Sequence, residues 1–252
     1  MTNKLKYFIG NWKMFGDFNS FKIINKINQY AQKHKSSKKF KIVLCVPNIL
    51  IDFFNKKLKR KLISIGAQNC YHEEGNGPFT GAISAGMLKK MGAEYIILGH
   101  SENRAEGETS KIIKKKIISA LNQKLNIILC IGEKYIDKKN GKTFSVIKNQ
   151  IKGSIEKKYN INKIILAYEP VWSIGTNKIP SSKDLKNVIK FIKNYFKRSF
   201  KTQNYPKVLY GGSVNKNNVK LLSTITEIDG FLIGGASQSA KKFIDIIKNY
   251  YK

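Results

Sequence analysis

Short apolar runs rich in β-branched residues alternate with longer amphipathic stretches from one end of the chain to the other. Each run is too apolar to leave one face of a strand in water, which indicates a parallel sheet covered by helices. The runs start roughly thirty residues apart, the repeat expected of strand–helix units. Eight strands are predicted, at residues 6–10, 41–46, 62–67, 95–98, 126–131, 163–168, 207–210 and 230–233.

The stretches between the strands repeat apolar residues at every third or fourth position, the period of a helix with one buried face. Eight such units in 252 residues favour a single (β/α)8 barrel, an α/β fold with eight parallel strands and an outer ring of helices, as one domain over residues 1–252. A doubly wound open sheet would give much the same pattern. The clearest predicted helices cover residues 18–34, 111–123, 144–157, 184–200 and 241–250.

The composition is strongly basic, with 47 Lys and Arg against 16 Asp and Glu and a formal net charge of +31. Such a charge raises nucleic acid as a partner, and a nucleic-acid-binding protein on a barrel scaffold remains an alternative. The lysines are spread along the whole chain, however, and only three residues are arginine, the better reader of phosphates and bases. We therefore expect no specific nucleic-acid partner.

No apolar run approaches the roughly 18 residues that cross a bilayer, so no membrane partner is expected. Cys45, Cys70 and Cys130 are odd in number and widely spaced, which favours buried thiols over a disulfide framework or a zinc site. The sequence thus predicts a soluble, cytoplasmic protein with no metal and no cofactor.

Candidate catalytic residues follow three of the predicted strands. Asn11 and Lys13 end the first strand, His100 and Glu102 follow the fourth, and Glu169 follows the sixth. In a barrel these strand ends meet at one rim, where the chemistry lies. A carboxylate can remove a carbon-bound proton, an imidazole can handle a proton on oxygen, and an ammonium can stabilise enolate charge. This set predicts proton transfer beside a carbonyl.

Glycine pairs follow the last two predicted strands, at 211–212 and 234–235. Glycine lets the backbone approach a ligand closely, and free N–H groups at the start of a helix attract an anion. Barrels commonly bind phosphate in these two loops. The sequence therefore predicts a small phosphorylated substrate.

Eight short motifs occur in order between residue 6 and about residue 238. They are Asn11-Trp12-Lys13, Gln68-Asn69, Phe79-Thr80-Gly81, Leu98-Gly99-His100-Ser101-Glu102, Cys130-Ile131-Gly132-Glu133, Ala167-Tyr168-Glu169-Pro170-Val171-Trp172, Tyr210-Gly211-Gly212-Ser213 and Gly234-Gly235-Ala236-Ser237. Together they resemble the triosephosphate isomerase family. The resemblance implies a cofactor-independent homodimer that interconverts dihydroxyacetone phosphate and D-glyceraldehyde 3-phosphate, in glycolysis and gluconeogenesis.

The resemblance also implies a role for each candidate residue. Glu169 would be the base, and a neutral His100 would polarise the carbonyl and shuttle the hydroxyl proton. Lys13 would stabilise the enediolate, Asn11 would hydrogen-bond the substrate oxygen, and Glu102 would hold Lys13. An inactive or repurposed phosphate-binding barrel is the runner-up, and the intact catalytic set argues against it.

Two further features are implied around this set. Residues 170–180 would form a lid over the substrate, with Trp172 swinging against Glu133. The loop with Phe79 and Thr80 would join two subunits, Thr80 reaching the other subunit's site. Backbone N–H groups would bind the phosphate at Gly175, Ser213, Gly234 and Gly235.

The chain departs from the family pattern at several positions. Asn177 stands in the lid where glycine is usual, and asparagine tolerates positive φ best among the other residues. The resemblance implies a hydrogen bond from the backbone N–H of residue 180 to the Tyr210 hydroxyl. Pro180 has no N–H, so this bond cannot form here. Ala82 and Asn103 replace a glutamate and an arginine that can pair, changes that bear on the contact between subunits.

Overall fold

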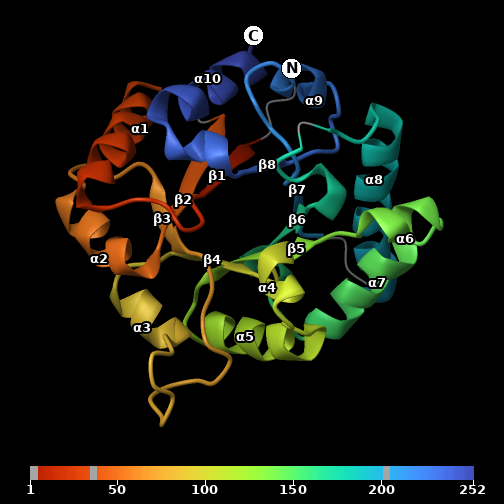
Figure 1. The fold of residues 1–252 in the computed structure, drawn as a ribbon, viewed down its shortest axis with the longest axis horizontal. Helices are drawn as coiled ribbons and strands as arrows, with labels where there is room; N and C mark the ends of the chain where they lie inside the picture. The colour runs from red at the N-terminus through yellow and green to blue at the C-terminus, as the bar shows by residue number, and fades with distance from the viewer. Residues whose placement is uncertain (1–4, 35–38, 177, 201–204) are drawn as a thin grey trace.

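The computed structural model describes residues 5–34, 39–176, 178–200 and 205–252. Within these residues eight strands form a closed barrel in sequence order, each parallel to the next (Figure 1). β8 closes the ring by pairing with β1, and Tyr7 lies opposite Gly230. The predicted (β/α)8 architecture is therefore confirmed, and the alternative of an open sheet is wrong.

The strand bounds lie close to those predicted. β3 starts two residues later than expected because the Leu62 N–H donates to Asn28 Oδ1 at 2.9 Å instead of to a neighbouring strand. The strands are β1 Lys6–Asn11, β2 Phe40–Cys45, β3 Ser64–Ala67, β4 Tyr95–Leu98, β5 Asn126–Ile131, β6 Ile164–Tyr168, β7 Lys207–Tyr210 and β8 Gly230–Ile233.

Helices surround the barrel (Figure 1). The predicted helix at 18–34 begins as a 3-10 turn, Phe18–Ser20, because the Asp17 carboxylate accepts the N–H of Ser20 and caps that turn. The α-helices of the described residues are α1 Phe21–Lys33, α2 Asn48–Lys57, α3 Ala85–Lys90, α4 Ser101–Ala105, α5 Ser110–Asn122, α6 Tyr135–Lys139, α7 Thr143–Ser154, α8 Ser182–Phe200, α9 Val219–Ser223 and α10 Ala240–Tyr250.

Two apolar layers hold this architecture together. Along β5, Ile127 and Leu129 pack outward against the helices, while Ile128 and Cys130 fill the barrel interior. This alternation follows from the two-residue period of a strand. The barrel interior is thus a packed core, and the open space lies at the ends of the strands.

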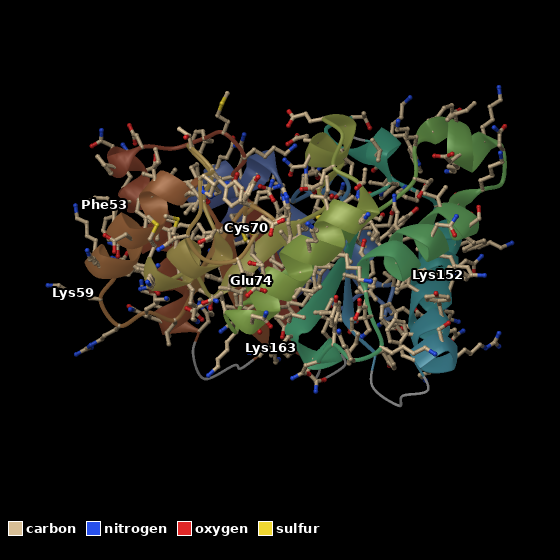
Figure 2. The ribbon with its side chains drawn as sticks, turned by 90° about the horizontal axis from the view of Figure 1, so that it is seen from below. Phe53, Lys59, Cys70, Glu74, Lys152 and Lys163 are labelled. Atoms are coloured by element: carbon tan, nitrogen blue, oxygen red, sulfur yellow. The ribbon has the colours of Figure 1, made fainter. Side chains whose placement is uncertain are left out.

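The cysteines are buried, and the lysines are spread over the surface (Figure 2). Cys45, Cys70 and Cys130 are free and buried, as predicted. Lysine side chains extend from separate parts of the molecule, as Lys59 and Lys152 show at opposite sides of Figure 2. Over the described part of the chain, none of the helices combines the length and apolar character that crossing a bilayer demands.

Candidate active site

A cavity of about 510 Å³ opens at the carboxyl ends of the strands. Asn11 lines it as the last residue of β1, Lys13 follows that strand, His100 follows β4, and Glu169 follows β6. The loops after β7 and β8 complete the wall. The structure therefore brings together the strand ends that the sequence singled out.

Lys13 is fixed at both its backbone and its side chain. Its φ of 56° is in the left-handed region, uncommon for a residue with a β-carbon, and its N–H donates to Asn11 Oδ1 at 3.1 Å. Its Nζ donates to Glu102 Oε1 at 2.6 Å. The ammonium is thus held at the edge of the cavity by a carboxylate from α4.

His100 is held in one tautomer by its place at the start of α4. Its Nδ1 accepts the backbone N–H of Glu102 at 3.3 Å. A ring nitrogen that accepts a hydrogen bond carries no proton, so the neutral ring carries its proton on Nε2. That nitrogen faces Glu169 Oε1 at 3.5 Å. Gly99, with φ of 67°, makes the turn that brings the ring to this position.

Glu169 is a buried carboxyl group, only 4% exposed. Burial raises its pKa above the usual glutamate range, and the nearby His100 partly offsets that rise. Its N–H donates to Ile131 O at 2.8 Å, which ties the end of β6 to β5. Among the described residues no group hydrogen-bonds Oε2.

Gly175, Ser213, Gly234 and Gly235, here called the cradle, line the same cavity. A β-carbon at Gly235 would meet nothing within 4 Å, and one at Gly234 would lie 3.9 Å from Lys13 Cε. The glycines thus border open space next to the ammonium. Because glycine has no side chain, the backbone N–H groups here can approach an anion closely.

The segment 170–180, here called the lid, is fixed at one end by its tryptophan. Trp172 Nε1 donates to Glu133 Oε1 at 3.0 Å, the contact expected from the sequence, and the Tyr168 hydroxyl donates to the same carboxylate at 3.2 Å. Lys138 Nζ lies 4.0 Å from the centre of the Trp172 ring. Asn177 lies outside the described residues.

Sequence reasoning missed residues that support the site from behind. Arg104 donates to Gly99 O at 2.8 Å and to Cys130 O at 3.2 Å, which joins the ends of β4 and β5. Arg104 could have been noticed in the sequence, because it is one of only three arginines in a lysine-rich chain. Lys138 and Ser173 carried no signal, since their roles depend on contacts that periodicity does not reveal. No cluster of three or more His, Cys, Asp or Glu suited to a metal ion occurs in the described ranges.

A buried carboxyl group, an imidazole and an ammonium beside glycine-lined loops are typical of the class of (β/α)8-barrel enzymes that move protons on a small anionic substrate. The family described as triosephosphate isomerase matches residues 6–250. The chain belongs to the triosephosphate isomerase family, and the function and the enzyme class predicted from the sequence, an isomerase, are confirmed.

Individual relatives agree over nearly the whole chain. Triosephosphate isomerase from Alkaliphilus metalliredigens is 40% identical over 244 residues, which cover 94% of this chain and 96% of that protein. The Dictyoglomus thermophilum enzyme is 38% identical, with 97% and 99% coverage. A crystal structure of triosephosphate isomerase from Bartonella henselae superimposes with a TM-score of 0.88 at 34% identity, covering 98% of this chain and 99% of that one.

Proposed function

We propose that this chain interconverts dihydroxyacetone phosphate and D-glyceraldehyde 3-phosphate, without a cofactor, through an enediolate. The observation that carries the proposal is the buried Glu169 carboxyl beside His100, in a cavity that Lys13 also lines. A base, a proton donor to oxygen and a cation are what proton transfer beside a carbonyl requires.

Glu169 is the base. Because burial raises its pKa, its carboxylate binds a proton more strongly than an exposed glutamate does. It removes the proton from the carbon beside the carbonyl. The electron pair of that C–H bond forms a carbon–carbon double bond, and the π pair of the carbonyl moves to its oxygen, which gives the enediolate. The carboxylic acid then returns the proton to the neighbouring carbon. The product is the isomer, and Glu169 is again ionised.

His100, Lys13 and Asn11 act on the oxygens. His100 donates its Nε2 proton to the carbonyl oxygen, and the same ring relays the hydroxyl proton. The support for this is that Nδ1 accepts the Glu102 N–H while Nε2 faces Glu169. The Lys13 ammonium stabilises the enediolate charge, and Glu102 holds it in place at 2.6 Å. The Asn11 amide hydrogen-bonds a substrate oxygen from the floor of the cavity.

The cradle binds the phosphate through its backbone N–H groups. Support for this comes from the open space in front of Gly235 and Gly175, where a β-carbon would touch nothing within 4 Å. Lys13 supplies the nearby formal charge. The phosphate anchors the substrate so that its carbon chain lies against Glu169.

A coupled isomerase assay on the purified protein tests this proposal. Glu169→Asp withdraws the carboxylate by about 1 Å, which costs on the order of 10²-fold in rate through lost alignment. Glu169→Gln removes the base and costs more. Near-normal turnover in Glu169→Gln would rule out Glu169 as the base, whereas an inactive native protein would rule out the isomerase reaction.

The active unit that we propose is a homodimer formed through the loop containing Phe79 and Thr80. Phe79 is 39% exposed, and Met14 and Ile49 expose apolar side chains beside a cavity of about 500 Å³ that borders Lys13. A second subunit would cover this apolar rim and exclude water from it. We further propose that residues 1–252 act as one catalytic domain in the cytoplasm, where the three buried thiols stay reduced.

A further inference from the structure

Ser173 is a fully buried serine at the first turn of the lid, in the 3-10 turn Val171–Ser173. Its Oγ donates to the carbonyl oxygen of Lys178 at 2.5 Å, across the lid. The same Oγ lies 2.9 Å from the hydroxyl of Tyr210, at the end of β7. The lid has two arms, the first ending at Ser173 to Thr176 and the second beginning at Lys178. The Ser173 side chain thus links the two arms and also contacts Tyr210 of the barrel.

The directions of these two bonds follow from counting protons. A hydroxyl has one proton, and a carbonyl oxygen can only accept, so the Ser173 proton goes to Lys178. Tyr210 must then donate to Ser173. Burial raises the pKa of Tyr210 to about 12, which keeps this donor protonated at neutral pH. The result is a series of two hydrogen bonds, in which Tyr210 donates to Ser173 and Ser173 donates to Lys178.

The two hydrogen bonds lie in a tightly packed part of the structure. Tyr210 is fully buried, and a β-carbon on Gly212 would lie 2.2 Å from the Tyr210 hydroxyl and 2.6 Å from Ser173 Oγ. Pro180, at the other end of the lid, has no N–H to offer Tyr210 as an alternative partner. The residues next to Ser173, Ile174 and Gly175, line the catalytic cavity.

We propose that Ser173 is a positioning residue for the reaction: its hydroxyl links the two arms of the lid to Tyr210 and so fixes Ile174 and Gly175 over the bound anion. The inference rests on the proposed function, and it adds to it a residue that never touches the substrate. Trp172 also bonds outside the lid, to Glu133, but its side chain does not reach Lys178 at the other end. The two bonds of the Thr176 hydroxyl join lid residues to one another.

The test compares Ser173→Ala, Tyr210→Phe and the double variant with the native protein. Ser173→Ala breaks both bonds and is expected to lower kcat/KM about 10- to 30-fold, while Tyr210→Phe breaks one and costs about 3- to 5-fold. The double variant should be no worse than Ser173→Ala, because the tyrosine hydroxyl has already lost its acceptor. Losses that multiply in the double variant would overturn the proposal.

A second measurement separates positioning from general stability. The inhibition constant of inorganic phosphate should rise in Ser173→Ala, since Gly175 would no longer be held over the anion. Ser154→Ala is the matched control, because Ser154 is also fully buried and its Oγ has no hydrogen-bond partner among the described residues. A lowered Tm in Ser173→Ala with an unchanged phosphate constant would show a merely structural role and would overturn the proposal.

A third measurement does not need turnover. The chain has two tryptophans, Trp12 between Asn11 and Lys13, and Trp172 in the lid. The part of the emission change on adding phosphate that is lost in Trp172→Phe therefore reports on the lid. Ser173→Ala should need several-fold more phosphate for the same change, and so should Tyr210→Phe. A native protein without isomerase activity would refute the proposed function, while equal phosphate titrations in the native and both variant proteins would refute the role of Ser173.

Discussion

A β-carbon on Gly211 would lie 2.6 Å from Cγ of Glu169. The backbone at this glycine is fixed, because its N–H donates to Tyr168 O at 2.8 Å. Any side chain there must therefore be accommodated by Glu169 itself. The Glu169 carboxyl group can therefore hold its observed position only because position 211 has no side chain.

Gly211→Ala is expected to displace the carboxylate and lower kcat on the order of 10²-fold, with KM changed little, because misalignment affects the chemical step. Steady-state kinetics measures this. Gly86→Ala serves as the control, since its β-carbon would meet nothing closer than 3.6 Å. An alanine variant at 211 that kept the native kcat would show that Glu169 tolerates the displacement.

The raised pKa of Glu169 links activity and stability to pH. Its acid limb in kcat/KM should lie above the ordinary glutamate pKa of about 4.3, because the base is lost once it is protonated. The change of folding stability with pH has the opposite direction from that of a carboxylate in an ion pair, whose pKa is lowered on folding. A folded-state pKa above the unfolded one contributes stability at low pH, and that stability is lost as the pH rises through the folded pKa.

Glu169→Gln should consequently raise Tm at pH 8, where the native protein holds a buried, ionised carboxylate. The difference in Tm between the two proteins should shrink as the pH falls toward the ordinary glutamate pKa. Calorimetry across this pH range is the measurement. A difference independent of pH would mean that ionisation of Glu169 does not affect the folding equilibrium.

The cradle predicts a change in binding rather than in chemistry. A valine at position 235 should not prevent folding, since a β-carbon there meets nothing within 4 Å. Its methyl groups would instead occupy the space in which the anion is proposed to bind. Gly235→Val should raise KM and the inhibition constant of inorganic phosphate together, by at least tenfold, with a smaller effect on kcat. An unchanged KM would locate the phosphate elsewhere.

The proposed homodimer predicts that charge at Phe79 dissociates the subunits. Phe79→Asp should shift the protein toward monomer at micromolar concentration and lower its activity, because the exposed ring loses its apolar partner surface. Phe144→Asp is a close control: Phe144 is 43% exposed and packs on Phe191 at 4.8 Å, as Phe79 packs on Tyr71 at 4.8 Å. Sedimentation that shows an active native monomer would contradict the dimer.

Strand positions could be predicted from sequence because each strand is apolar on both faces. β4, β5, β7 and β8 have the bounds predicted from their apolar runs alone. The apolar pattern did not reveal α4, because five residues are too few to show a helical period, although the family resemblance implied a helix start near His100. In the pattern its start was visible only as the end of a strand at His100.

The candidate site could be predicted in its residues but not in its geometry. Asn11 ends a strand, and Lys13, His100 and Glu169 follow strands within two residues, so the barrel alone brings them to one rim. The tautomer of His100 depends on a backbone N–H two residues away in a helix that the pattern did not reveal. Ser173 depends on Tyr210, 37 residues further along the chain, a contact with no local signature.

Closure of the barrel by β1 and β8 sets the moment in synthesis at which this enzyme can exist. Trp12 Nε1 donates to Ser237 O across 225 residues, and β1 has one unpaired edge until residues 230–233 arrive. The wall beside Lys13 is likewise incomplete until Gly234 and Gly235 have been synthesised, since both glycines line the same cavity and Gly234 lies next to the Lys13 side chain. A chain still on the ribosome can hold most of its strands in order and yet have no site. Catalysis begins only after the last strand joins the first, so activity itself reports that the ring has closed.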